Sequence, residues 1–210
     1  MTIFITFEGP EGSGKTTIIS MLSEALKDTN ELMVTREPGG IPISEKVRDI
    51  LLANENDMDG RTEALLFAAA RRQHLVEKVV PALDDGKIVL CDRFIDSSLA
   101  YQGYARNLGI DEIMQINKFA IEDHMPDLTI YLKLSPEIGL KRIQDNKRDS
   151  NRLDKETLQF HKDVVLGYNK LSETFPNRIK VVDADQNIED VFKDTYSIIE
   201  KYMNRRGDRS

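Results

Sequence analysis

The sequence predicts an α/β protein whose doubly wound parallel sheet carries helices on both faces. Short apolar runs rich in β-branched residues alternate along the chain with longer segments whose apolar residues recur at helical spacing. The short runs are continuously apolar, which is typical of parallel strands covered on both sides. A glycine-rich loop joins the first run to the first helical segment, so a ligand site is expected at the carboxyl ends of the strands.

The expected elements follow one another without a repeat, linker or low-complexity tract. A single domain over residues 1–210 is therefore expected, with a frayed, polar and basic tail at about 204–210. The strands are expected at residues 3–7, 32–35, 87–91, 128–134 and 178–182. The helices are expected at residues 17–26, about 44–53, 62–83, 111–122, 136–144, 155–174 and 188–203.

Composition limits the kinds of partner. The chain has 210 residues and a formal net charge of −7, from 36 acidic and 29 basic residues, so no general binding to nucleic acid or to an anionic membrane is expected. The one cysteine, Cys91, excludes an internal disulfide and lies in an apolar run, where a buried strand thiol is expected. No signal-peptide pattern precedes the first strand and no apolar stretch is long enough to span a bilayer, so we expect a cytoplasmic protein.

Residues 9–16 satisfy the phosphate-loop pattern G-x-x-x-x-G-K-[ST] between a strand and a helix. The glycines let successive N–H groups converge on a phosphate, and the helix N-terminus adds partial positive charge. Lys15 is expected to reach the β- and γ-phosphates, and the Thr16 hydroxyl to bind Mg²⁺. The loop by itself predicts a nucleoside triphosphate and Mg²⁺. Its predicted nucleotide-binding residues are Gly9, Pro10, Glu11, Gly12, Ser13, Gly14, Lys15, Thr16 and Thr17.

A second polar group, Asp92-Arg93-Phe94, directly follows the strand at 87–91. The carboxyl ends of parallel strands share one rim of the sheet, so Asp92 is expected near the phosphate loop. Its carboxylate would hold Mg²⁺ directly or through water, and Arg93 would grip a second phosphate. An ion pair between Asp92 and Arg93 at the strand end is the alternative.

Three segments together resemble the bacterial thymidylate kinases: residues 8–17, the T-R-E-P-G-G stretch at 35–40, and the D-R-F-I-D-S-S-L-A-Y-Q-G stretch at 92–103. They stand in the family's order and spacing, and the resemblance covers essentially the whole chain. It implies a five-stranded P-loop kinase fold with a short mobile lid, and phosphorylation of thymidine monophosphate (dTMP) to the diphosphate by ATP. It also implies a homodimer, through the helices near 62–83 and 111–122.

The resemblance further implies roles for individual side chains. Phe67 would stack on thymine, and Arg71, one helical turn later, would hydrogen-bond its O4. Ser98 and Gln102 would face the N3 side of the base, and Tyr101 would crowd the sugar 2′ position. Without the resemblance, Phe67 would be taken for core and Arg71 for solvated helix surface. Arg36, Arg48 and Arg93 would surround the acceptor phosphate, with Glu8 near the sugar hydroxyl and the phosphates.

The most polar segment, residues 144–152, has no apolar side chain and lies between two expected helices. The variable positions of the phosphate loop carry no basic residue, which resembles the subtype whose catalytic arginine comes from a closing lid. A lid at about 143–154 is therefore expected, with Arg148 and Arg152 as catalytic candidates. Arg142 would approach the adenine or the phosphates, and residues 183–186 would lie beside the adenine.

Two alternatives stay open at this point. Residues 146–149 match N-K-x-D and residues 57–60 match D-x-x-G, the patterns of a GTP-binding switch, but neither follows an expected strand. A kinase for another nucleoside monophosphate, or for deoxynucleosides, is closer, although Phe67, Arg71 and Tyr101 favour thymine and deoxyribose. His74, near the acceptor helix, is expected on solvated helix surface rather than behind the substrate site.

Overall fold

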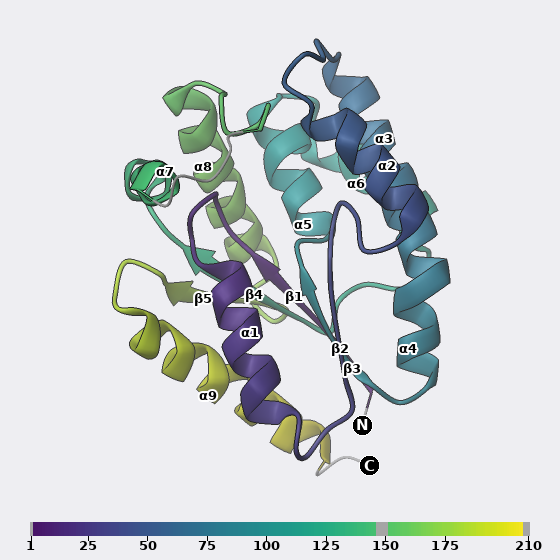
Figure 1. Ribbon diagram of the computed structural model, residues 1–210, viewed down its shortest axis with the longest axis vertical. Coiled ribbons are helices and arrows are strands. Elements are labelled where there is room, and N and C mark those ends of the chain that lie inside the picture. The colour runs from purple at the N-terminus through teal and green to yellow at the C-terminus, as the bar shows by residue number, and fades with distance from the viewer. Residues whose placement is uncertain (1, 146–150, 208–210) are drawn as a thin grey trace.

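The computed structural model describes residues 2–145 and 151–207, and Figure 1 shows a sheet with helices packed on both sides. All strand pairings are parallel, in the order β2-β3-β1-β4-β5, which confirms the predicted fold class. The strands are β1 Ile3–Glu8, β2 Leu32–Arg36, β3 Ile88–Asp92, β4 Leu128–Lys133 and β5 Ile179–Asp183.

The helices fall close to their expected places. They are α1 Lys15–Leu26, α2 Pro42–Leu52, α3 Gly60–His74, α4 Val80–Asp84, α5 Ile95–Ser98, α6 Ile110–Ile121, α7 Pro136–Asp145, α8 Leu158–Thr174 and α9 Ile188–Gly207. Two π-helical segments, η1 Leu75–Val79 and η2 Leu99–Ala105, continue α3 and α5. Among the helices of the described ranges, none combines the length and the apolar character needed to cross a membrane.

Each strand faces two apolar cores because successive side chains point to opposite sides of the sheet. In β1, Ile3, Ile5 and Phe7 pack with α1 and α9 on one face. Phe4 points to the other face, into a core built with α3, α6 and α8. Cys91 of β3 is a free, fully buried thiol in that second core, as its apolar neighbours predict. Burial on both faces explains why the inner strands β1, β3 and β4 are almost continuously apolar in sequence.

Four helical segments differ from the expected ones. The helix expected over 62–83 is interrupted by the π-helical segment η1, and η2 forms in a stretch for which no helix was expected. α8 begins at Leu158, because Thr157 caps it by accepting a hydrogen bond from the backbone N–H of Phe160 at 3.2 Å. α9 continues to Gly207, so residues 204–207 are helical rather than part of a frayed tail. Arg206 in this last turn donates to the Thr2 carbonyl at 3.0 Å.

Candidate active site

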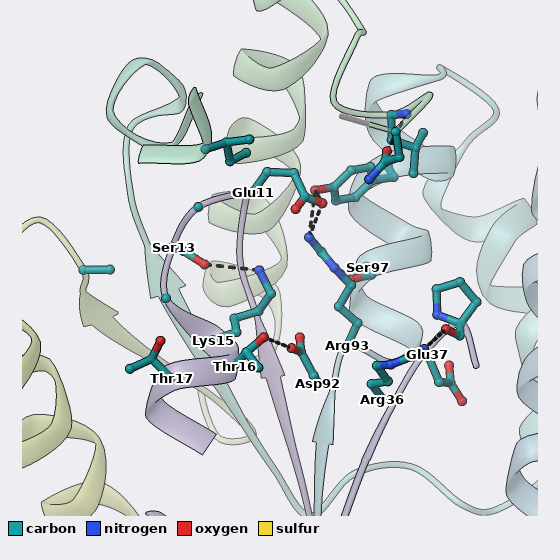
Figure 2. A pocket seen from close by; sticks show the side chains of 18 of the residues that line it. Glu11, Ser13, Lys15, Thr16, Thr17, Arg36, Glu37, Asp92, Arg93 and Ser97 are labelled. Carbon is teal, nitrogen blue, oxygen red and sulfur yellow. Dashed lines mark hydrogen bonds and ion pairs between the residues drawn. The ribbon is translucent and has the colours of Figure 1, made fainter. Parts of the chain in front are cut away.

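A cavity of about 670 Å³ lies at the carboxyl end of the sheet, between the phosphate loop and the region of α2, α3 and η2 (Figure 2). Segments far apart in sequence meet there, because β3 lies between β1 and β2 in the sheet. The predicted site residues that line the cavity are Glu11, Gly12, Ser13, Gly14, Lys15, Thr16, Thr17, Arg36, Arg48, Phe67, Arg71, Asp92, Arg93, Ser98, Tyr101, Gln102 and Arg142.

The phosphate loop is tightly packed from outside. Gly12 has φ +73°, and a Cβ there would lie 2.3 Å from the carbonyl oxygen of Gly139 in α7. A Cβ on Gly9, at φ +146°, would lie 2.5 Å from the Leu132 carbonyl oxygen. Both positions therefore require glycine, for space as well as for backbone conformation. The loop's N–H groups are held in their curve by backbone contact, before any ligand binds.

Lys15 closes this loop from inside. Its Nζ donates to the carbonyls of Gly9 at 3.1 Å and Pro10 at 3.0 Å, and to Ser13 Oγ at 3.2 Å (Figure 2). Gly9 and Pro10 thus stabilise the loop by accepting hydrogen bonds from Lys15 through their carbonyls. Neither residue lines the cavity. Burial lowers the pKa of Lys15 to about 8, and the positive charge of Arg93 acts in the same direction. An anion in the loop would relieve both effects.

Thr16 and Asp92 meet at the base of the cavity. The Thr16 hydroxyl donates to Asp92 Oδ2 at 2.9 Å (Figure 2). The other carboxylate oxygen, Oδ1, is buried and has no hydrogen-bond partner among the described residues. A carboxylate and a hydroxyl beside a phosphate loop are the oxygen ligands that Mg²⁺ uses with nucleotides. The pair therefore fits the metal position that the sequence predicts.

Arg93 connects the phosphate loop with η2 and α8. At φ +68° its backbone is left-handed, and its guanidinium donates to the Gly9 carbonyl at 3.1 Å and to Tyr168 Oη at 3.2 Å. The guanidinium also pairs with Glu11 at 2.6 Å and lies 5.2 Å from the centre of the Tyr101 ring. The ion pair of Arg93 is thus with Glu11 of the phosphate loop, and the Glu11 side chain points toward Arg93 (Figure 2).

Glu8, expected near the sugar and the phosphates, lies beneath the cavity and does not line it. Its carboxylate accepts hydrogen bonds from the Phe94 N–H at 2.7 Å, Ser97 Oγ at 2.6 Å and Tyr168 Oη at 2.9 Å. Burial raises the pKa of Glu8 to about 7, and the negative charge of Asp96 adds to the rise. In this conformation Glu8 holds the backbone that follows β3. Arg93, in the same segment, reaches the cavity.

Arg36 and Arg48 converge at the edge of the cavity. Each donates from Nη1 to the carbonyl oxygen of Pro38, at 2.8 and 2.9 Å. Glu45 holds Arg36 from the other side, with its Oε2 accepting a hydrogen bond from Nη2 at 3.0 Å. Burial and the neighbouring Arg36 lower the pKa of Arg48 below its ordinary value. Two cations this close favour an anionic ligand between them.

Arg71 is fully surrounded by acceptors. Its Nε donates to Glu37 Oε2 at 2.8 Å, Nη1 donates to Ser98 Oγ at 3.1 Å and to Asn117 Oδ1, and Nη2 donates to the Phe94 carbonyl at 2.9 Å. Only 2% of the Arg71 surface is exposed, so the solvated alternative is excluded. These contacts fix its guanidinium in one orientation. Arg71 and Phe67 both line the cavity.

His74 lies behind the site, and the expectation of solvated surface is wrong. It is fully buried, with Nδ1 2.9 Å from Glu37 Oε1 and Nε2 2.7 Å from Thr35 Oγ1. His74 follows Arg71 by three residues, so both lie on the inner face of α3. This three-residue spacing could have predicted that His74 lies behind the site, beside Arg71. Glu37, which both side chains contact, was also missed, although it lies inside the T-R-E-P-G-G stretch.

The basic residues expected in the lid and just before it take separate places. Arg142 donates from Nη1 and Nη2 to the Ala184 carbonyl, both at 3.2 Å, and lines the cavity beside the loop at 183–186 as expected. Arg148 lies outside the described residues, as does the N-K-x-D match at 146–149. Arg152 does not line the cavity; it donates from Nε to the Leu51 carbonyl at 2.9 Å and pairs with Glu63.

The second switch-like match lies away from the cavity. Residues 57–60 lie in the connection between α2 and α3, where Asp59 caps α3 by accepting from the N–H groups of Arg61 at 2.9 Å and Thr62 at 3.0 Å. The aspartate of the match itself, Asp57, is exposed, follows no strand and does not line the cavity. The GTP-switch alternative therefore has no support from this segment.

Comparison with known proteins identifies the family. A family model described as thymidylate kinase matches residues 7–195. The chain is 59% identical over 203 residues to the thymidylate kinase of Staphylococcus haemolyticus (strain JCSC1435), covering 97% of this chain and 100% of that protein. It is 61% identical over 194 residues to the thymidylate kinase of Clostridium novyi (strain NT), covering 91% and 95%.

The fold gives the same result. The crystal structure of thymidylate kinase from Ehrlichia chaffeensis matches with a TM-score of 0.76 at 33% identity, covering 94% of this chain and 98% of that one. The phosphate loop, the rim aspartate and the arginine-lined second half of the cavity thus occur in a chain that resembles these enzymes over nearly its whole length. This chain belongs to the thymidylate kinase family.

Proposed function

We propose that the protein transfers the γ-phosphate of ATP to thymidine 5′-monophosphate, giving ADP and thymidine 5′-diphosphate for DNA synthesis. One observation carries the proposal beyond family membership: a single cavity joins a phosphate loop to a second half lined by Arg36, Arg48 and Arg93. A triphosphate donor and a monophosphate acceptor need two such anion sites facing each other. A switch protein needs only one.

The donor half is the phosphate loop. We place the β- and γ-phosphates of ATP against its N–H groups and Lys15, and the adenine beside Arg142 and the loop at 183–186. Mg²⁺ would be held by Thr16 and by Asp92, whose buried Oδ1 lacks a partner among the residues described. When bound, this ion would neutralise negative charge on the phosphates.

The acceptor half would hold dTMP. Arg36, Arg48 and Arg93 would bind its phosphate, because all three line the cavity and Arg36 and Arg48 meet at the Pro38 carbonyl. Phe67 would stack on thymine, Arg71, Ser98 and Gln102 would hydrogen-bond the base, and Tyr101 would pack against the sugar. Arg71 and Tyr101 are each fixed by neighbours, which favours a substrate of one defined shape.

In the transfer, an oxygen of the dTMP phosphate attacks the γ-phosphorus while the bond to the β–γ bridging oxygen breaks. Lys15 and Arg93 stabilise the charge that spreads over the transferred group. Arg93 is suited to this because its side chain already reaches the Gly9 carbonyl and Glu11 in the phosphate loop. Arg148 of the expected lid remains our candidate for a further catalytic cation, and Glu8 supports Arg93 from below.

We also propose that the protein is a cytoplasmic homodimer. Apolar side chains are exposed on neighbouring elements: Leu65 of α3 is 56% exposed, and Phe119 of α6 is 90% exposed. A fully exposed phenylalanine is costly in water and typical of a partner surface. The buried, unpaired thiol of Cys91 agrees with a reducing compartment.

The test is ADP release in a coupled assay with ATP, Mg²⁺ and a panel of thymidine, uridine, cytidine and adenosine monophosphates. Rapid turnover that depends on dTMP is expected. Equal rates with another monophosphate would favour a different nucleotide kinase. Strong preference for GTP with no dependence on a monophosphate would favour a switch protein.

A further inference from the structure

A carboxylate outside the cavity controls a side chain inside it. Glu63 lies in the first turn of α3, is fully buried and does not line the cavity. Its Oε1 accepts hydrogen bonds from Gln102 Nε2 at 2.7 Å and Arg106 Nε at 3.3 Å. Its Oε2 accepts from Arg106 Nη2 at 3.1 Å and Arg152 Nη2 at 2.5 Å. Of these partners only Gln102 belongs to the cavity wall.

The two arginines keep Glu63 ionised. Burial raises the pKa of Glu63, but the hydrogen bonds and charge of Arg106, together with Gln102 and Arg152, bring it below its ordinary value. An ionised carboxylate can only accept hydrogen bonds, whereas a glutamine amide has a donating end and an accepting end. The NH₂ group of Gln102 must therefore face Glu63, and its carbonyl Oε1 must face away.

This orientation gives the cavity wall a defined polarity. Gln102 Oε1 accepts no hydrogen bond from the part of the chain that is described. This oxygen is therefore left to accept a hydrogen bond from a ligand. Arg71, in the same wall, carries only donors. An acceptor beside a donor complements thymine, which has an N3–H donor beside an O4 acceptor. Cytosine has the reverse order, with an unprotonated N3 beside an amino group.

We propose that Glu63, which would touch no substrate, is a positioning residue that sets the base specificity of the acceptor site by fixing the amide of Gln102. This inference rests on the proposed function, since it assumes a pyrimidine monophosphate in the acceptor half. Arg106 and Arg152 contribute by holding the carboxylate charged and in place. Arg152, near the end of the expected lid, is thus tied to the acceptor pocket through Glu63, instead of serving as the catalytic arginine in this conformation.

The experiment compares kcat/KM for dTMP and for deoxycytidine monophosphate in the wild-type protein and in Glu63→Gln. A glutamine at position 63 can donate or accept, so it no longer dictates which end of Gln102 faces the cavity. Preference for dTMP is expected to fall roughly tenfold, the effect of one hydrogen bond, mainly through a higher KM for dTMP. The KM for ATP is expected to stay unchanged.

The matched control is Glu156→Gln. Glu156 pairs with Arg106 at 2.5 Å but does not contact Gln102. This variant removes one ion pair of Arg106, the arginine that also binds Glu63, and it should keep the wild-type preference for dTMP. In a Gln102→Ala background, Glu63→Gln should have no further effect on the preference, because the two residues act as one unit. Glu63→Asp keeps the charge but shortens the reach to Gln102, and it replaces Glu63→Gln if that variant does not fold.

Unchanged preference in the folded variant at position 63 would overturn the inference and leave the proposed function standing. The same holds if Glu156→Gln lowers the preference as much, or if the effect persists without Gln102. A wild-type protein that does not phosphorylate dTMP would overturn the proposed function, and this inference with it.

Discussion

Three cations of the cavity are each held by a carboxylate from a different part of the chain. Glu11 pairs with Arg93, Glu45 with Arg36, and Glu37 with Arg71. Each pair orients a flexible side chain before a ligand arrives, which lowers the entropy lost on binding. The cavity is thus prepared for anions even though the whole chain carries a net charge of −7.

Asp92 gives the first prediction. Asp92→Asn removes the charge of a carboxylate whose Oδ1 is buried without a described partner, while keeping its shape. The Mg²⁺ concentration needed for half-maximal activity should rise about 10- to 100-fold. A Mg²⁺ titration of the coupled assay measures this, with Asp85→Asn at an exposed position as the control. An unchanged titration curve would remove Asp92 from the metal site.

Glu8 gives a prediction about stability. Its pKa of about 7 in the folded protein exceeds the ordinary 4.5, so the folded state binds more protons than the unfolded state between these pH values. The free energy of unfolding should therefore fall as pH rises from about 4.5 to 7. Relative to Glu8→Gln, the wild type should lose up to about 3 kcal/mol over this range.

Urea unfolding at pH 5, 6, 7 and 8 measures the difference between the two proteins. Glu55→Gln, in the exposed connection after α2, should show no such trend. A difference between wild type and Glu8→Gln that does not change with pH would show that Glu8 titrates near its ordinary pKa.

The motif residues could be predicted from sequence, but their supports could not. Lys15, Asp92 and Arg93 follow from local patterns, since each stands at a fixed place after a strand or in a loop. Glu37 and His74 meet across 37 positions, and Glu63 and Gln102 across 39, so no local pattern relates them. Such contacts depend on how the loop after β2 and the segment η2 pack on α3.

At the level of elements, the wall of the acceptor half is built on π-helical turns. The four-residue spacing of Ser98 and Gln102 predicts a shared face, and both line the cavity together with Tyr101. The chain reaches this arrangement through η2, whose wider turns are common near functional sites. Periodicity of apolar residues cannot reveal a π-helix, because the same residues fit an α-helix. The inner strands were easier to predict because both of their faces are apolar and buried.

The contact between the phosphate loop and α7 gives a prediction at this scale. Gly12→Ala adds a Cβ at φ +73° that would lie 2.3 Å from the Gly139 carbonyl oxygen. Gly86→Ala is the matched control, with φ +84° and nothing within 4 Å. The control should lose about 1–2 kcal/mol of stability from strain, and Gly12→Ala should lose more.

Gly12→Ala should also weaken ATP binding, because the loop must shift to remove the clash, whereas Gly86→Ala should not. Urea unfolding and calorimetric titration with ATP measure the two effects. Equal stability losses with equal ATP affinities would mean that the loop is not constrained by α7.

At the scale of the molecule, the two halves of the cavity stand on one sheet, with the donor loop after β1 and the acceptor groups after β2 and β3. Figure 1 places α2, α3 and α6 together at one side of the sheet, away from β5. The acceptor half is therefore built on the side of the molecule where we propose that two copies meet.

Phe119 tests that proposal. Phe119→Lys places a charge where 90% of a phenylalanine surface is exposed, and Val181→Lys does the same at a 46% exposed position on β5. Sedimentation equilibrium should show a dimer for the wild type and for Val181→Lys, and a monomer–dimer mixture for Phe119→Lys. A wild-type protein that stays monomeric, or equal effects of both substitutions, would contradict the proposed interface.

The proposed function requires that one cavity bring the γ-phosphate of ATP to a dTMP acceptor. The most direct measurement follows ATP labelled in its γ-phosphate, with and without dTMP, and separates the products. The label should move to thymidine 5′-diphosphate in proportion to dTMP consumed, with little free phosphate. Label released as inorganic phosphate at the same rate with and without dTMP would contradict the proposed function.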